Sequence, residues 1–242
     1  MNYLVISDIH ANFTALKAVL SDAKDYDAVW VLGDIVGYGP DPNECIEKVK
    51  SLPNLVCILG NHDAAVIDKI QEITFNPTAR QVIYWTRSVI NDENLRYLKN
   101  LPERKIINEV TLVHGSPREP VWEYLLDVHS ATENFNYFDT PYCFIGHSHL
   151  PTLFTLEDEQ TQARLTVPKN NRLVELQPRV IINPGSVGQP RDRDPRAAYA
   201  IFSLINKTVE FRRVEYDIQD VQRRMRQANL PHRQIERLID GW

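Results

Sequence analysis

The chain has 242 residues, of which 43% are hydrophobic and 24% are charged, and its formal net charge is −5. This length can bury a substantial core, and the composition is typical of a soluble globular protein. An acidic chain exerts no general attraction on nucleic acid or anionic membrane, so we expect neither as a stable partner.

The lack of a recognisable targeting pattern and the sparse cysteines bear on the expected compartment. No apolar stretch approaches the roughly 18 residues that span a bilayer, and the N-terminus has no signal-peptide pattern. The three cysteines, Cys45, Cys57 and Cys143, have neither the spacing of a zinc site nor that of a redox pair. These features predict a cytoplasmic location.

The first part of the chain alternates strands with helices. Apolar, Val- and Ile-rich runs predict buried strands at residues 3–6, 28–32, 55–59, 110–113 and 142–145. Helical spacing of apolar residues predicts helices over 12–23 and 41–52, between the first three strands. This order indicates an α/β fold with a parallel or mixed sheet.

The middle of the chain interrupts this alternation. Residues 64–105 are predicted to form a helical insertion, with Asn76-Pro77 beginning one helix and Asn91 or Asp92 capping another. Residues 116–140 are interpreted as a long loop.

The second half has a different pattern. Residues 153–156, 163–167, 173–177, 180–183, 199–204 and 209–216 are β-rich, and they predict an antiparallel half or a second sheet packed on the first. Residues 218–242 are predicted to be helical, with a break at Pro231. We expect a single two-sheet domain over residues 1–242.

Five short segments each end an apolar run with residues that can bind metal. They are Asp8-Ile9-His10, Gly33-Asp34, Gly60-Asn61-His62-Asp63, His114-Gly115 and Gly146-His147-Ser148-His149, and they hold five of the seven histidines. Imidazole and carboxylate are the usual ligands of a catalytic transition metal, and there are enough here for two ions. The pattern predicts a two-metal hydrolase, for which phosphate esters are natural substrates.

The placement of these segments supports a shared site. Each follows a predicted strand, where the loops of an α/β sheet converge, and ligands two residues apart face one side of an extended chain. Two ions about 3.5–4 Å apart need a bridging ligand, and Asp34 is the best candidate. The expected nucleophile is a hydroxide that bridges the two metals.

This order of motifs resembles the calcineurin-like metallophosphoesterases. The stretches Gly33-Asp34-Ile35-Val36-Gly37-Tyr38-Gly39-Pro40 and Asn183-Pro184-Gly185-Ser186-Val187-Gly188-Gln189-Pro190-Arg191 are similar to those of the small bacterial and archaeal phosphodiesterase-like branch. The resemblance implies a four-layer α-β-β-α sandwich of two packed mixed sheets with helices outside.

The resemblance also implies roles for individual residues. One metal would be bound by Asp8, His10, Asp34 and His149, and the other by Asp34, Asn61, His114 and His147. His62 would be the general acid or transition-state donor to the leaving oxygen, with Asp63 orienting its ring. Mn²⁺ is the first candidate metal, with Fe, Zn, Co and Ni as alternatives.

Substrate contacts are less determined by the motifs. Arg191 is expected to contact phosphate, because guanidinium matches phosphate geometry, and Asn12 is a second candidate. Two aromatic residues that follow the His114 segment, Trp122 and Tyr124, are as compatible with walling the substrate cleft as with having no contact with it. Arg212, Arg213, Arg223, Arg224 and Arg226 alternate with acidic residues and are interpreted as a solvated face.

The predicted function is metal-dependent hydrolysis of a small phosphodiester, with a nucleotide as one candidate. The alternatives are a phosphomonoesterase or phosphoprotein phosphatase, a nucleotide-polyphosphate hydrolase, and a non-catalytic scaffold of the same fold. The pattern leaves the natural substrate, the native metal and the oligomeric state open.

Overall fold

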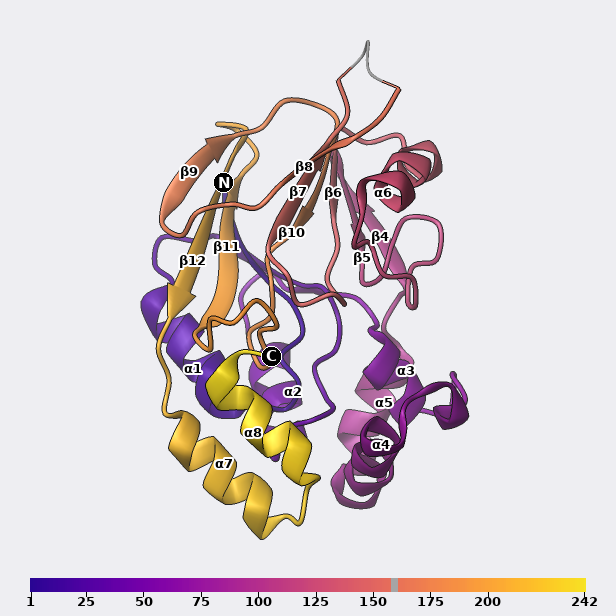
Figure 1. Cartoon of the computed structure of the whole chain (residues 1–242), viewed down its shortest axis with the longest axis vertical. Coiled ribbons are helices and arrows are strands. Elements are labelled where there is room, and N and C mark those ends of the chain that lie inside the picture. The colour runs from indigo at the N-terminus through magenta and orange to yellow at the C-terminus, as the bar shows by residue number, and fades with distance from the viewer. Residues whose placement is uncertain (158–160) are drawn as a thin grey trace.

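Strands from both halves of the chain form two mixed six-stranded sheets in the computed structural model, which describes residues 1–157 and 161–242 (Figure 1). The first sheet has the order β3-β2-β1-β11-β12-β9. Its strands are β1 (Asn2–Ile6), β2 (Ala28–Val31), β3 (Val56–Cys57), β9 (Arg172–Glu175), β11 (Ala197–Ser203) and β12 (Thr208–Val214). β1, β2 and β3 are parallel, whereas β11 pairs antiparallel with β1.

The second sheet has the order β4-β5-β6-β10-β7-β8. Its strands are β4 (Arg104–Ile107), β5 (Val110–Val113), β6 (Tyr142–Phe144), β7 (Thr152–Thr155), β8 (Arg164–Thr166) and β10 (Val180–Asn183). β5, β6 and β10 are parallel to one another. The prediction that the second half forms its own sheet is therefore wrong, because each sheet takes strands from both halves.

Some helices cover the outer faces of the sheets, and others lie beyond the strand ends. In chain order they are α1 (Phe13–Asp22), α2 (Pro42–Lys50), α3 (Asn61–Val66), α4 (Pro77–Val89), α5 (Asp92–Lys99), α6 (Val128–Asn134), α7 (Ile218–Gln227) and α8 (His232–Asp240), with short 3₁₀ turns at Glu72–Thr74 and Phe135–Tyr137. Figure 1 shows α1 and α2 beside the first sheet, α6 beside β4 and β5, and α7 and α8 below the strand ends. Among the described residues, no helix has both the length and the apolar character required to cross a bilayer.

Three apolar layers hold this arrangement together. Alternate residues of β1 face opposite ways: Leu4 and Ile6 pack against α1 and α2, while Tyr3 and Val5 pack against the second sheet. On the far face of that sheet, Cys143 and its neighbours pack against α6. The four-layer α/β expectation is confirmed.

Two local predictions differ from the structure. Residues 116–140 are not all loop, since Asp127 caps α6 by accepting a hydrogen bond from the Ser130 N–H at 2.9 Å. The predicted helical insertion runs to about residue 105, but β4 already begins at Arg104. Both elements are short, and tertiary packing rather than a clear sequence period stabilises them.

Candidate metal centre

All five predicted segments lie at the carboxyl ends of parallel strands. Asp8 follows β1, Asp34 follows β2, Asn61 follows β3, His114 follows β5, and His147 follows β6. Because these strand ends converge from both sheets, residues far apart in the sequence meet at one buried place. The seven predicted ligands are between 0 and 3% exposed.

One group of ligand atoms comes from Asp8, His10 and His149. The Nε2 atoms of the two imidazoles are 3.0 Å apart, and Asp8 Oδ1 lies 3.3 Å from His149 Nε2 and 3.8 Å from His10 Nε2. One candidate ligand atom from each residue lies within 4.8 Å of the others. This spacing lets three donors face one cation.

A second group comes from Asp34, His114 and His147, whose candidate ligand atoms also lie within 4.8 Å of one another. Asn61 joins it, with its Oδ1 3.1 Å from His114 Nε2. Asp34 Oδ2 is 3.4 Å from His114 Nε2 and 3.7 Å from His10 Nε2. This carboxylate oxygen therefore lies between the two groups.

Backbone carbonyls fix the orientation of the four ligand imidazoles. His10 Nδ1 donates to Val36 O at 3.2 Å, His114 Nδ1 to Leu32 O at 2.7 Å, and His149 Nδ1 to Gln189 O at 2.5 Å. His147 uses its other nitrogen, Nε2, which donates to Trp122 O at 3.0 Å. One nitrogen of each ring is thus held protonated, which leaves the other free to bind a metal.

The backbone at the ligands is itself unusual. Asp8, His10, Asp34, His147 and His149 have φ angles between 49° and 64°, in the left-handed region that side chains rarely occupy. Such strain costs of order 1–3 kcal/mol per residue and gathers at functional sites. The site is also closely packed, since a Cβ on Gly60 would lie 2.1 Å from Asp34 Oδ1 and only glycine fits there.

Burial and mutual charge set the protonation of the centre. Burial raises the pKa of Asp8 to about 7 and lowers the pKa values of His10, His147 and His149. For His114, burial lowers the pKa, but the Asp34 carboxylate outweighs it and the value rises to about 9. The pKa of Asp34 is lowered because nearby histidines outweigh its burial.

The residues fit divalent transition metals. Asp34 Oδ2 is buried and, among the described residues, has no hydrogen-bond partner, although one oxygen of the same carboxylate accepts from the His62 N–H at 2.8 Å. A carboxylate oxygen is costly to bury without a partner unless a cation satisfies it. The surrounding imidazole, carboxylate and amide donors are those that Mn, Fe, Co and Zn accept.

His62 lies beside both groups without belonging to the ligand set. One of its ring nitrogens is within 4.8 Å of candidate ligand atoms of His10 and Asp34. The ring packs against Tyr38 and Phe75, with centroids 4.5 and 5.0 Å away, and burial lowers its pKa to about 4. Burial therefore favours the neutral ring, which can donate one N–H.

Asp63 does not orient the His62 ring. One of its carboxylate oxygens accepts from the Val36 N–H and the other from the Gly60 N–H, both at 3.1 Å. His62 Nδ1 has no hydrogen-bond partner in residues 1–157 and 161–242. The predicted role of Asp63 is thus corrected: it joins two loops of the site, and aromatic packing rather than a carboxylate positions His62.

The two residues predicted to contact the substrate, Arg191 and Asn12, have different environments in the structure. Arg191 is half-buried beside the centre and remains a prediction. Asn12 is only 1% exposed; its Oδ1 accepts from the Ala15 N–H at 3.0 Å, and its Nδ2 donates to Gly188 O at 3.0 Å. The structure thus replaces the predicted substrate contact of Asn12 with a capping role at α1.

Aromatic residues border the centre on its open side. The Tyr124 ring stacks on the His147 ring with centroids 3.7 Å apart, and it is 45% exposed. Trp122 is 37% exposed and packs edge-on against Phe75. Both side chains therefore lie beside the candidate ligands and are partly exposed, which is compatible with a cleft wall, and that role stays a prediction.

Two residues beside the centre escaped the sequence analysis. Arg233 and Arg237 of α8 line a cavity with Arg191, Tyr124 and Ser148. Their spacing of four residues places both on one face of a helix, which is the signal that was available. Of the other C-terminal arginines, Arg223 is 58% exposed and pairs with Asp220, as expected for a solvated face. Arg213 contradicts that expectation, because its side chain is only 3% exposed and pairs with Asp192. Arg212 and Arg224 are partly buried and also pair with carboxylates.

Full-length comparisons agree with this architecture. The chain is similar to a metallophosphoesterase from Sphaerobacter thermophilus of known structure, with 48% identity, a TM-score of 0.91, and coverage of 100% of this chain and 99% of that one. It is 40% identical to the uncharacterized protein MJ0912 of Methanocaldococcus jannaschii over 98% of this chain and 97% of that protein.

A more distant similarity concerns a named enzyme. Over 103 residues the chain is 30% identical to the symmetrical bis(5'-nucleosyl)-tetraphosphatase of Pectobacterium carotovorum, a match that covers 36% of this chain and 37% of that enzyme. The family model of the calcineurin-like phosphoesterase superfamily domain matches residues 1–207. The motifs, the two-sheet fold and these matches agree, and the chain belongs to the calcineurin-like phosphoesterase superfamily.

Proposed function

We propose that this protein is a metal-dependent phosphodiesterase that acts on a small substrate and uses two divalent ions. The observation that carries the proposal is the position of Asp34 Oδ2, which is buried 3.7 Å from His10 Nε2 and 3.4 Å from His114 Nε2. An oxygen shared by two ligand groups is what a bridged metal pair requires.

The proposed ligand sets follow the two groups. Asp8, His10, Asp34 and His149 would hold one ion, and Asp34, Asn61, His114 and His147 the other, with Mn²⁺ as the first candidate. When bound, such ions activate water as a nucleophile and neutralise charge on the phosphate oxygens.

The chain's own residues would complete the reaction. His62 donates its N–H to the oxygen of the leaving group, which develops negative charge as its bond to phosphorus breaks. Tyr38 and Phe75 hold the ring in place and keep water from its faces. Arg191 binds a phosphate oxygen with its guanidinium.

A dinucleoside polyphosphate is a second candidate substrate. The name of the tetraphosphatase relative supports it, although that match covers only 36% of this chain. Phosphomonoesters and phosphoproteins remain alternatives, and the complete ligand set argues against a non-catalytic scaffold.

We further propose that residues 1–242 act as one domain, because α7 and α8 pack against α4 through one apolar cluster. A cytoplasmic location stays a prediction.

Hydrolysis of two chromogenic esters tests the proposal. The chelated protein is supplied with Mn²⁺ and assayed on bis(4-nitrophenyl) phosphate and on 4-nitrophenyl phosphate. We expect Mn²⁺ to restore activity, with the diester as the better substrate. A preference for the monoester would indicate a phosphatase instead. No hydrolysis of either ester by the metal-loaded protein would contradict the proposal.

A further inference from the structure

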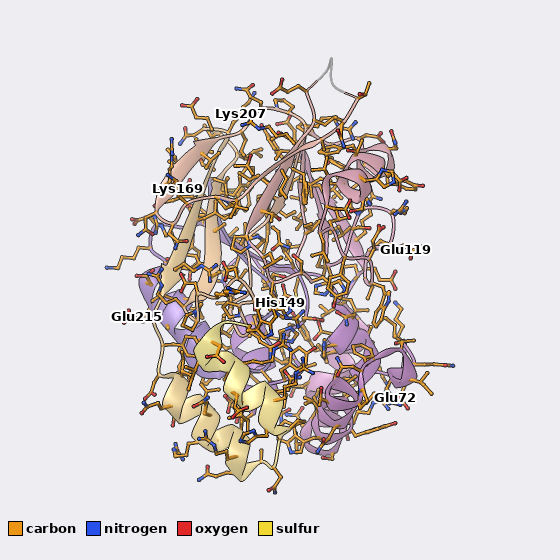
Figure 2. The ribbon with its side chains drawn as sticks, in the orientation of Figure 1. Glu72, Glu119, His149, Lys169, Lys207 and Glu215 are labelled. Atoms are coloured by element: carbon orange, nitrogen blue, oxygen red, sulfur yellow. The ribbon has the colours of Figure 1, made fainter. Side chains whose placement is uncertain are left out.

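A cavity of about 380 Å³ lies next to the proposed metal centre and contains three arginines, Arg191, Arg233 and Arg237. Ser148, which also lines it, stands between the ligands His147 and His149, and Tyr124, a third lining residue, stacks on His147. The cavity therefore borders residues that adjoin or contact the proposed ligands His147 and His149. In Figure 2, His149 is labelled near the middle of the view, between the strands above and the helices below.

The three guanidinium groups have no Asp or Glu partner in the part of the chain that the structure describes. None of them forms an ion pair with an acidic side chain there, and Arg191 Nε is buried without a hydrogen-bond partner. Arg191 Nη2 donates to Gln189 Oε1 at 3.3 Å, and the Arg191 guanidinium also interacts with the Tyr124 hydroxyl and lies 5.9 Å from the Tyr38 ring centroid. Arg237 Nε donates to Trp242 O. Most of their donors are thus available to a ligand.

Without a bound anion, the positive charges of the pocket arginines repel one another. Burial and the nearby Arg191 charge lower the pKa of Arg237 to about 10. Like charges held this close raise the free energy of the folded protein, and a multiply charged anion would remove that cost.

The elements that carry the arginines are fixed relative to the centre. Gln189 O accepts from His149 Nδ1, and Gln189 Nε2 donates to Gln234 Oε1 of α8 at 3.0 Å. Ile235 and Leu238 of α8 pack into the cluster with α4 and α7. A single chain of contacts therefore connects a proposed ligand to the helix that bears Arg233 and Arg237.

We propose that this arginine pocket binds a second phosphate group of the substrate, so that the protein selects phosphate esters that carry at least two phosphates. The inference rests on the proposed function for the reaction at the neighbouring centre. Guanidinium groups bind phosphate by paired, charge-assisted hydrogen bonds. The exposed Trp242 ring at the rim offers an apolar surface to the organic part of the substrate.

Direct binding tests the pocket without relying on turnover. Calorimetry compares inorganic pyrophosphate with orthophosphate on the full-length, Mn²⁺-loaded protein and on the double variant Arg233→Ala/Arg237→Ala. Coordination of pyrophosphate to metal is common to both proteins and cancels in the comparison. The preference is the Kd for orthophosphate divided by the Kd for pyrophosphate. We expect this ratio to be at least about tenfold larger for the native protein than for the double variant, because one or two charge-assisted contacts to the second phosphate contribute that much binding free energy.

A matched control variant removes one arginine charge outside the pocket. Arg226→Ala changes an exposed arginine of α7 outside the pocket and is expected to leave the pyrophosphate preference unchanged. An equal preference in the native protein and the double variant would overturn the proposal, and so would the absence of measurable pyrophosphate binding.

Turnover then separates this proposal from the proposed function. The double variant is expected to keep kcat/KM on bis(4-nitrophenyl) phosphate, which carries one phosphate, within about twofold. A large loss on that ester would mean that the arginines serve the centre itself and would overturn the second-phosphate role. If the native protein hydrolyses no ester but shows an arginine-dependent preference for pyrophosphate, the pocket stands and the proposed reaction fails.

Discussion

The ligand cluster and the arginine pocket lie side by side but are built in opposite ways. The seven proposed ligands are at most 3% exposed, and backbone carbonyls hold their four imidazoles. In the pocket, Arg233 is exposed and Arg191 and Arg237 are half-buried, with few contacts to their guanidinium groups. A rigid, desolvated cluster suits chemistry, whereas an open, charged pocket suits the selection of substrates.

The two regions also differ in their place along the chain. All proposed ligands fall within residues 8–149, inside the part that matches the superfamily model at residues 1–207. Arg233 and Arg237 lie outside it, on α8. This division suggests that the reaction belongs to the common fold and the substrate preference to the C-terminal helices. A substitution in the cluster should then affect all substrates alike.

The largest effect is expected from Asp34→Asn. The amide keeps the shape of the side chain but removes the charge that both ligand groups face, so both metals should bind weakly and turnover should fall to the level of the metal-free protein on every ester. Metal analysis after gel filtration measures the occupancy, with exposed Asp139→Asn as the matched control. A variant that retains two tightly bound equivalents would refute the bridging role.

A smaller effect is expected from His62→Ala. Metal content should remain, while turnover should fall by about 10²–10⁴-fold if the ring donates to the leaving oxygen. The loss should be greatest for esters with poor leaving groups, because these need the donor most. His129→Ala removes a histidine that is 84% exposed and serves as the control. Equal losses for good and poor leaving groups would exclude His62 as the donor.

The smallest effect is expected from Asn12→Ala. Loss of the α1 cap should lower the free energy of unfolding by about 1 kcal/mol and leave the activity of the folded protein unchanged. Asn76→Ala, which removes the cap of α4, should cost a similar amount and provides the comparison. Denaturant unfolding and kcat/KM measure the two quantities. A loss of activity without a loss of stability would restore Asn12 as a substrate contact.

The sequence predicted those features that depend on local order. The buried strands and the glycine-flanked ligand segments have patterns within a few residues, and the caps at Asn76 and Asn91 are likewise local. Because parallel strands bring their carboxyl ends together, the meeting of Asp8, Asp34 and His114 also followed from the strand pattern.

Features that depend on long-range placement were not predictable in the same way. Each sheet combines strands from both halves of the chain, and in the first sheet this requires β11 to pair with β1, which is almost the whole chain length away in sequence. The partners of Asp63 are backbone N–H groups, which the sequence does not distinguish. Arg233 and Arg237 gain significance only because α8 packs beside the loop that carries Arg191, and no local pattern records that contact.

A calorimetric titration of the chelated, full-length protein with Mn²⁺ tests the central claim most directly. Two groups of ligands that share Asp34 predict two equivalents of Mn²⁺ per chain, with Asp34→Asn weakening both. Saturation at one equivalent, or no binding at all, would contradict a centre built for two metals.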